Sequence, residues 1–295
     1  MAPMTSEIKI ALLAGRGVVS VEGPQARAFL QGLVTNDVGK LDRESAIHAG
    51  LLSPQGKILF DFFIVKSADG VLLDVAKDRT GDLAKRLTLY KLRAPVTIRD
   101  ASESYRVYAL FGPASIPDDG IVNGGITYSD PRLESLGRRA IVAADLPVIA
   151  NTDSSAYDDH RITVGVPEGG RDYAFGDAFP HEALFDQLSG VSFTKGCYVG
   201  QEVVSRMEHR GTARKRIVPV ETVDGSALRT NEPVRAGEVE IGTVGSVSGS
   251  RGLALLRLDR VEEYAVKGVP IIAGGATLRV DIPSWAHLKP TAPHG

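Results

Sequence analysis

The chain has one cysteine, Cys197, and it lies in the segment KGCYVGQE, residues 195–202. Glycines close to it on both sides allow backbone conformations that other residues avoid. Lys195, two positions before the thiol, favours the nucleophilic thiolate form. A helix expected from Val203 to Glu208 would begin beside this segment, and a helix N-terminus favours an anion or a thiolate. Two interpretations follow: a reactive thiol, or a cysteine that packs inward within a glycine-bounded loop.

A single cysteine limits the metal and redox chemistry that the chain could perform by itself. It excludes an intrachain disulfide, a cysteine-based zinc site and a four-cysteine iron–sulfur site. The six histidines are scattered, and because none has the spacing typical of metal ligands, we predict no metal site. Any iron–sulfur chemistry would therefore serve the clusters of other proteins.

Length and composition indicate a soluble globular protein. The 295 residues suit two or three subdomains, with 43% hydrophobic and 24% charged residues. A net charge of −2 gives no overall field that would attract nucleic acid or an anionic membrane. No apolar run approaches the roughly 20 residues that span a bilayer, and Met1–Ile10 lacks the features of a signal or transit peptide. We expect a cytoplasmic protein with neither a nucleic-acid nor a membrane partner.

The elements expected before residue 212 mix helices and strands without regular βαβ alternation. Helices are expected over Gly23–Asp37 and Asp78–Leu92, and a loop over Gly112–Asp130. Strands are expected over Ala46–Leu52, Ile58–Val65, Val71–Ala76, Val96–Arg99, Tyr105–Phe111, Ala140–Val142 and Arg161–Val166. Residues 1–212 therefore form an α+β region, which we divide into two subdomains.

The pattern changes near Arg214, after which no helix is expected. Strands over Ile217–Glu221, Val239–Ser248, Leu253–Asp259 and Thr277–Ile282 are separated by turns rich in glycine, proline and asparagine. Glycines at positions 242, 245, 249 and 252 suit the corners and bulges of a small barrel. Residues 213–295 are therefore predicted to form an antiparallel β-barrel.

The KGCYVGQE segment matches the signature of the YgfZ family, a branch of the glycine-cleavage T-protein (aminomethyltransferase) superfamily. Three further stretches resemble that family in the same order: Phe29–Asp37, Gln55–Ile58 and Arg161–Pro167. The resemblance implies ferredoxin-like and related α+β subdomains closed by the C-terminal barrel around a central cavity. It also implies that a reduced folate, tetrahydrofolate or a derivative, occupies that cavity.

What the resemblance implies about function leaves three alternatives. The first is a tetrahydrofolate-binding accessory protein in the assembly, insertion or repair of iron–sulfur clusters, with client or assembly proteins as partners and Cys197 as key residue. The second is a folate-dependent aminomethyltransferase or other one-carbon transferase that uses Asp61. T-proteins carry two adjacent aspartates there, whereas this chain has Phe60-Asp61, which favours the first alternative. The third is a folate-binding scaffold, so enzymatic activity is left open.

The resemblance also names the candidate site residues. The catalytic candidates are Cys197, Lys195 and Asp61. The folate-binding candidates are Thr35, Asn36, Asp61, Arg161, Glu182, Tyr198, Gln201, Glu202 and Arg206.

Three of these candidates have plain structural alternatives. The Glu182 carboxylate suits the donor edge of a pterin, or it complements the first turn of a helix. The Arg206 guanidinium matches a folate glutamate tail, or it belongs to a solvated basic linker. Arg161 reaches the cavity or is an exposed strand residue.

Overall fold

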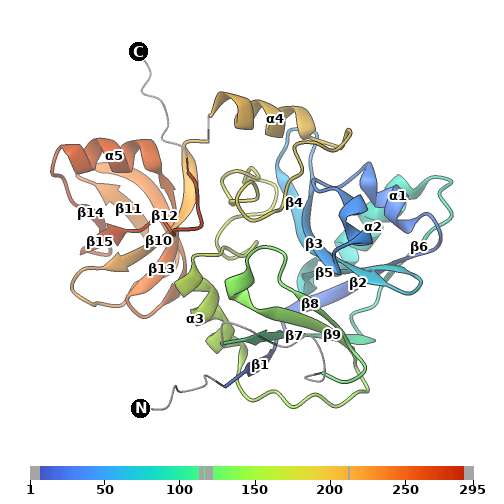
Figure 1. Cartoon of the computed structure of the whole chain (residues 1–295). Helices are drawn as coiled ribbons and strands as arrows, with labels where there is room; N and C mark the ends of the chain where they lie inside the picture. The colour runs from blue at the N-terminus through green and yellow to red at the C-terminus, as the bar shows by residue number, and fades with distance from the viewer. Residues whose placement is uncertain (1–6, 113–115, 117–121, 212, 289–295) are drawn as a thin grey trace. The chain divides into compact units, whose positions relative to one another are not determined.

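The computed structural model describes residues 7–112, 116, 122–211 and 213–288 (Figure 1). The chain forms two compact units. The first comprises Met1–Leu52, Leu59–Tyr157 and Leu188–Val199, and the second comprises Ser53–Ile58, Asp158–Gln187 and Gly200–Gly295. Residues 158–187 and 200–211 therefore belong to the same unit as the C-terminal strands, although our boundary at residue 213 lies beyond them.

A five-stranded antiparallel sheet forms the centre of the first unit, with the strand order β3-β4-β5-β2-β6. Its strands are β2 (Arg16–Glu22), β3 (Ala46–Leu52), β4 (Ile58–Ser67), β5 (Gly70–Ala76) and β6 (Thr97–Asp100). β3, β4 and β5 agree closely with the prediction because turn sequences separate their apolar runs.

Side-chain alternation gives this sheet two apolar faces. Phe62 and Ile64 of β4 belong to a core that includes Leu30, Leu83 and Leu87 from two helices. Those helices are α1 (Ala26–Gln31) and α2 (Thr80–Lys91). The short 3₁₀ helices η1 (Val38–Asp42) and η2 (Lys77–Arg79) also belong to this part of the unit.

The opposite face of the sheet packs on a second, four-stranded sheet with the order β1-β7-β9-β8. Its elements are β1 (Lys9–Leu12), β7 (Tyr105–Phe111), β8 (Ile126–Ser129), η3 (Glu134–Leu136) and β9 (Arg138–Ala143). Phe63 of β4 and Val107 of β7 contribute to the shared core. β8 lies inside the expected loop Gly112–Asp130, of which residues 113–115 and 117–121 lie outside the described residues.

A closed six-stranded barrel dominates the second unit and confirms the predicted C-terminal fold. Its strands are β10 (Lys215–Thr222), β11 (Pro233–Ala236), β12 (Val239–Ser248), β13 (Arg251–Arg257), β14 (Ile271–Ala273) and β15 (Ala276–Val280). A close approach of two strands explains the glycine at position 242 of β12. A Cβ there would lie 2.1 Å from the Leu255 carbonyl oxygen of β13. Only glycine allows the two strands to pair so closely.

The expectation of no helix after Arg214 is wrong. Helix α5 (Leu258–Val266) follows β13 and packs against the barrel core through Leu258, Val261 and Tyr264 (Figure 1). Glu263 forms ion pairs with Arg260 and Lys267 at helical spacing. The three-residue spacing of the apolar positions is a helix signal, but only nine residues carry it.

The expected strand Arg161–Val166 is also wrong, because its first four residues end helix α3 (Ser154–Val164). The β-branched run Ile162-Thr163-Val164 favours a strand by propensity. The stronger signal stands upstream, where the Asp153 carboxylate accepts from the Ala156 N–H at 3.2 Å and caps the helix start. Gly165, at φ +88°, ends the helix.

Candidate functional site

Cys197 is a free and solvent-exposed cysteine in the first unit. Gly196 beside it is exposed as well, and Phe193 is 44% exposed despite its large aromatic side chain. The interpretation of an inward-packing cysteine is therefore wrong. Gly200 has φ +82° and precedes helix α4 (Gln201–Arg210) in the second unit, which agrees with the expected helix.

Lys195 is buried and donates to three backbone carbonyl groups. Its Nζ lies 2.7 Å from the Gln31 oxygen, 2.7 Å from the Val34 oxygen and 2.8 Å from the Asn36 oxygen. Helix α1 ends at Gln31, so these carbonyls belong to the helix end and the turn after it, where helical partners run out. Burial lowers the pKa of Lys195 to about 8, which leaves the ammonium mostly charged at pH 7. The geometry gives Lys195 the role of positioning the cysteine loop.

Thr35 and Asn36 also bind backbone groups of the first unit. The Thr35 hydroxyl donates to the Gly190 oxygen at 2.6 Å and accepts from the Gly50 N–H at 2.8 Å. The Asn36 side chain donates to the carbonyl oxygens of His48 and Ser189 at 2.8 and 2.7 Å. Both residues therefore join β3 to the segment that leads to Cys197.

Tyr198 anchors the loop from the other side of the cysteine. Its side chain is 7% exposed, and its ring centroid lies 5.2 Å from the Lys195 Nζ. Burial raises the pKa of the Tyr198 phenol to about 12, so the ring stays neutral. Two buried residues thus flank one exposed thiol.

Asp61 is half-buried on β4, and alternation places it on the face that carries Phe63. Its negative charge acts on His48, a residue that sequence analysis did not single out. Burial lowers the pKa of His48 to about 4, while the negative charge of Asp61 acts in the opposite direction. The imidazole is therefore neutral at pH 7, with its Nδ1 3.0 Å from the Leu188 oxygen.

Five charged residues of the first unit form what we call the arginine cluster: Arg16, Asp74, Asp130, Arg132 and Arg139. Asp74 accepts from Arg16 Nε at 2.6 Å and Arg139 Nη1 at 3.0 Å. Asp130 accepts from Arg132 Nη2 at 2.8 Å and Arg139 Nε at 3.1 Å. The two arginines hold the pKa of Asp130 far below its usual range against the opposing effect of burial.

The arginine cluster surrounds one aromatic ring. The three guanidinium carbons lie 4.6–5.7 Å from the Phe63 centroid, within cation–π range. Tyr128 donates to Asp74 at 2.9 Å. Sequence analysis missed this cluster because its members come from separate strands and loops, and no local pattern joins them.

Arg161 is almost fully buried, at 1% exposure. Its guanidinium donates to Asp172 at 2.8 Å, to the Ser246 hydroxyl at 2.7 Å and to Asp158 at 2.9 Å. These bonds join α3 to strand β12 within the second unit. The alternative of an exposed strand arginine is wrong, and the geometry gives Arg161 a structural role.

The remaining candidates lie in the second unit. The Glu182 carboxylate accepts from the Phe179 N–H at 2.8 Å. It therefore stabilises a turn and does not complement the first turn of a helix. Gln201 and Glu202 open α4, where Glu202 is exposed, and Arg206 is exposed further along the same helix. A solvated position for Arg206 agrees with its structural alternative.

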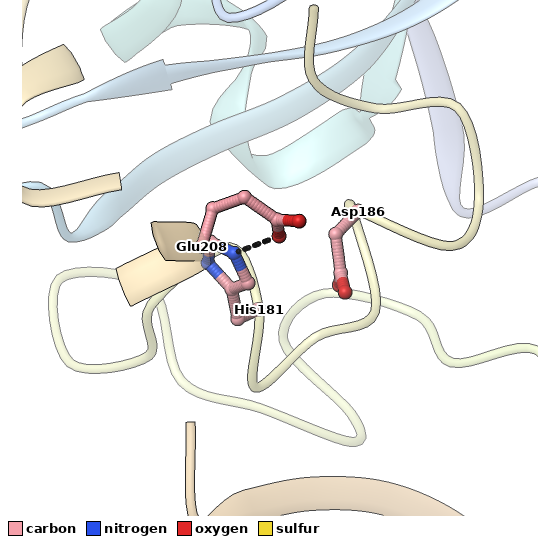
Figure 2. A group of neighbouring side chains, drawn as sticks. All are labelled: His181, Asp186 and Glu208. Atoms are coloured by element: carbon pink, nitrogen blue, oxygen red, sulfur yellow. Dashed lines mark hydrogen bonds and ion pairs between the residues drawn. The ribbon is translucent and has the colours of Figure 1, made fainter. Parts of the chain in front are cut away.

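One group of possible metal ligands was missed altogether: His181, Asp186 and Glu208, all of the second unit (Figure 2). Each offers a ligand atom, and these atoms lie within 4.8 Å of one another. The absence of a metal site, expected from the spacing of the six histidines, stays a prediction, while folding places His181 beside two carboxylates. Sequence spacing gives no signal, because 22 positions separate Asp186 from Glu208 and only folding brings them together.

Two family models match parts of the chain. The GCVT N-terminal domain matches residues 13–117, and the CAF17 C-terminal beta-barrel domain matches residues 214–288. The first covers most of the first unit's sheets and the second covers the barrel. Together the two models match parts of both units.

Several relatives are described by the same name, iron-sulfur cluster assembly factor IBA57. The iron-sulfur cluster assembly factor IBA57 of Homo sapiens is 33% identical over 92% of this chain and 84% of its own length. The IBA57 homologue of Mycosarcoma maydis is 38% identical over 73% of this chain. That alignment spans 58% of the fungal protein, and a Neurospora crassa homologue is spanned over 52% of its length. The chain thus matches little more than half of these two fungal relatives.

A solved structure shares the fold. The glycine cleavage system aminomethyltransferase T from Bartonella henselae superposes with a TM-score of 0.74 over 96% of this chain and 88% of its own, at 15% identity. This likeness confirms the α+β fold with its C-terminal barrel. At 15% identity it supports a statement about the fold only.

These comparisons contradict the expected cytoplasmic location, because the relatives named above are described as mitochondrial proteins. Among the described residues, no helix combines the length and apolarity that crossing a bilayer requires.

Proposed function

Because the chain belongs to the IBA57 family of iron–sulfur cluster assembly factors, we propose that it acts in the assembly of iron–sulfur clusters through Cys197. The observation that carries the proposal is an exposed thiol between two buried anchors, Lys195 and Tyr198. The KGCYVGQE segment supports the narrower assignment to the YgfZ branch.

The chemistry of a lone thiol defines the kind of partner. Thiolate is the soft ligand that iron–sulfur clusters prefer, and a cluster is typically held by four ligands. One cysteine supplies one of them, so the others come from a client or assembly protein. A rigidly held and exposed loop suits this shared binding, because the thiol meets the partner without reorganising its own backbone.

We also include a reduced folate in the proposal, with Asp61 as its ligand in the first unit. A half-buried carboxylate beside a neutral His48 suits the donor groups of a pterin. Thr35, Asn36 and Arg161 fit the ligand less well, because protein groups already engage their polar atoms. The folate would supply one-carbon chemistry or serve as a structural ligand.

A one-carbon transferase is the competing proposal, favoured by the position of Asp61 on β4 of a fold shared with an aminomethyltransferase. The two proposals differ in which side chain is essential. Cys197 is essential for cluster assembly, whereas Asp61 is essential for transfer.

Maturation of an iron–sulfur enzyme in cells that depend on this protein tests both proposals. We expect Cys197→Ser to abolish maturation, Asp61→Asn to retain most of it, and Thr194→Val, a change in the same exposed loop, to retain all of it. If Asp61→Asn abolishes function while Cys197→Ser does not, the transferase proposal replaces ours.

Calorimetry with tetrahydrofolate tests the folate proposal independently. A micromolar Kd, about −8 kcal/mol, is within reach of a buried pterin. We expect Asp61→Asn to weaken binding and Cys197→Ser to leave it unchanged. Absence of heat with several reduced folates would remove the folate from the proposal.

A further inference from the structure

His181, Asp186 and Glu208 bring one imidazole and two carboxylates to a single point of the second unit (Figure 2). His181 Nε2 lies 3.2 Å from Glu208 Oε2, and all three ligand atoms lie within 4.8 Å of one another. Donor atoms that share one metal ion at bond lengths of about 2.0–2.2 Å lie about 3–4 Å apart. Small side-chain adjustments therefore bring this set to coordination distance.

A small cavity opens at the same point and has room for an ion. Its volume is about 40 Å³, and its lining includes the three ligand residues, Arg216 and a second histidine, His287. A space of this size suits one water-sized or ion-sized guest. The cavity is reached from Glu208, whose side chain is 34% exposed, whereas that of His181 is 2% exposed.

The backbone of His287 is fixed in a way that ties it to this group. Its N–H donates to the Gln187 side-chain oxygen at 2.9 Å, and the amide nitrogen of Gln187 donates to Asp186 at 2.9 Å. The second histidine is thus held at the rim of the cavity by a neighbour of the ligand carboxylate. The backbone of His287 is thus fixed beside the cavity, while the ligand group itself consists of His181, Asp186 and Glu208.

A hydrogen bond already joins two of the proposed ligands, His181 and Glu208. Because the Glu208 carboxylate only accepts, the hydrogen of the 3.2 Å contact belongs to His181 Nε2. A metal ion held at Nε2 would take the place of that hydrogen, and the imidazole would bind as a neutral ligand with its proton on Nδ1, without net proton release.

Arg216 acts both for and against a cation at this point. Its Nη1 donates to Asp186 Oδ1 at 2.7 Å and to the His181 carbonyl oxygen, which fixes the orientation of the carboxylate. Its positive charge opposes a second cation. The two carboxylates, Asp186 and Glu208, supply the opposing attraction for a cation.

We propose that His181, Asp186 and Glu208, with His287 at the rim, bind one divalent transition-metal ion. Imidazole combined with carboxylate suits zinc or iron(II), whereas magnesium and calcium prefer oxygen ligands alone. The site uses no sulfur and lies in the unit that does not contain Cys197. It is therefore independent of the cluster chemistry proposed for the thiol, and either can fail without the other.

Calorimetric titration with Zn²⁺ in the Cys197→Ser background tests the site without competition from the thiol. We expect one ion per chain, and Glu208→Gln to weaken binding by at least about 10- to 100-fold, the range observed even for residues outside the coordination sphere. Glu202→Gln is the matched control, since it makes the same change at an exposed position of the same helix. Mg²⁺ should give no binding at the same concentrations.

Co²⁺ serves as a spectroscopic probe of the ligands. We expect visible absorption bands that His181→Gln removes and that His209→Gln, on the exposed face of α4, leaves unchanged. Circular dichroism establishes that each variant is folded. The proposal is overturned if the Cys197→Ser protein binds no Zn²⁺ at pH 7.5, or if Glu208→Gln binds as tightly as Glu202→Gln.

Discussion

Two groups of charged side chains, one in each unit, differ in how their charges are paired and in their access to solvent. In the arginine cluster, three guanidinium groups meet two carboxylates over the Phe63 ring, and the tyrosine hydroxyl of Tyr128 adds a further donor. In the group around His181, the Arg216 guanidinium binds Asp186, Glu208 contacts His181, and a cavity of about 40 Å³ is lined by all four residues.

The difference separates stability from binding. Ions that are buried and fully paired contribute to the fold, and removing one partner leaves an uncompensated charge that is expensive to bury. A group that lines a cavity and has a partly exposed carboxylate keeps capacity for a ligand. The same residue types therefore predict a structural role in the first unit and a binding role in the second.

Neutralising one carboxylate in each group gives the largest expected contrast. Asp74, at 0% exposure, accepts from Arg16, Arg139 and Tyr128. Asp74→Asn should lower the free energy of unfolding by about 3–5 kcal/mol, the range for a broken buried ion pair. Glu208→Gln should lower it by less than about 1 kcal/mol, as a partly exposed pair does. Urea denaturation measures the loss in unfolding free energy for both variants. Equal losses would contradict the distinction between the two groups.

The pH dependence of stability tests the neutral histidine of the first unit. The pKa of His48 is about 4 in the folded protein, against 6.5 as the ordinary value. Between these values the unfolded state binds the proton more strongly, so stability is present above pH 6.5 and is lost as the pH falls toward 4. The loss amounts to about 3 kcal/mol at about 1.4 kcal/mol per unit.

His48→Gln should remove this component of the pH profile, while His209→Gln, which is exposed, should not. Urea denaturation at pH 7, 6, 5 and 4 provides the measurement. An unchanged slope in His48→Gln would assign the acid sensitivity to other groups.

Lys195 provides the next contrast, because it is a buried charge whose three hydrogen bonds go to neutral backbone carbonyl groups. Lys195→Met removes three charge-assisted bonds to the carbonyls after α1 but also removes the burial of an ammonium group. We expect a net loss of about 2 kcal/mol in unfolding free energy together with impaired enzyme maturation. Lys85→Met, on an exposed lysine of α2, should change neither.

Sequence patterns predict local elements of this protein better than its charged groups. The strands β3, β5 and β12 and the helix α2 follow from apolar periodicity and turn residues between their ends. Arg161 was assigned to a strand because β-branched neighbours outweighed the capping signal of Asp153 eight residues earlier. Local propensity gave way there to tertiary contacts with Asp172 and Ser246.

The roles of individual site residues needed the fold. The motif around Cys197 identified the exposed thiol, but Lys195 was expected to act on that thiol and instead binds carbonyl groups some 160 positions away. The His181 group joins a turn region to helix α4, and the arginine cluster joins several strands. Such long-range contacts leave no periodicity in one sequence.

Cys197→Ser has the smallest expected effect on stability and separates the loop's anchors from its exposed group. The thiol is exposed, and the substitution changes little volume, so the urea midpoint should stay where it is. Lys195→Met should shift that midpoint because Lys195 is buried. In the maturation assay both variants should fail, Cys197→Ser through the lost ligand and Lys195→Met through a displaced loop. If Cys197→Ser shifts the midpoint as far as Lys195→Met does, the cysteine is a packing residue, and the exposed thiol no longer supports a role in cluster assembly.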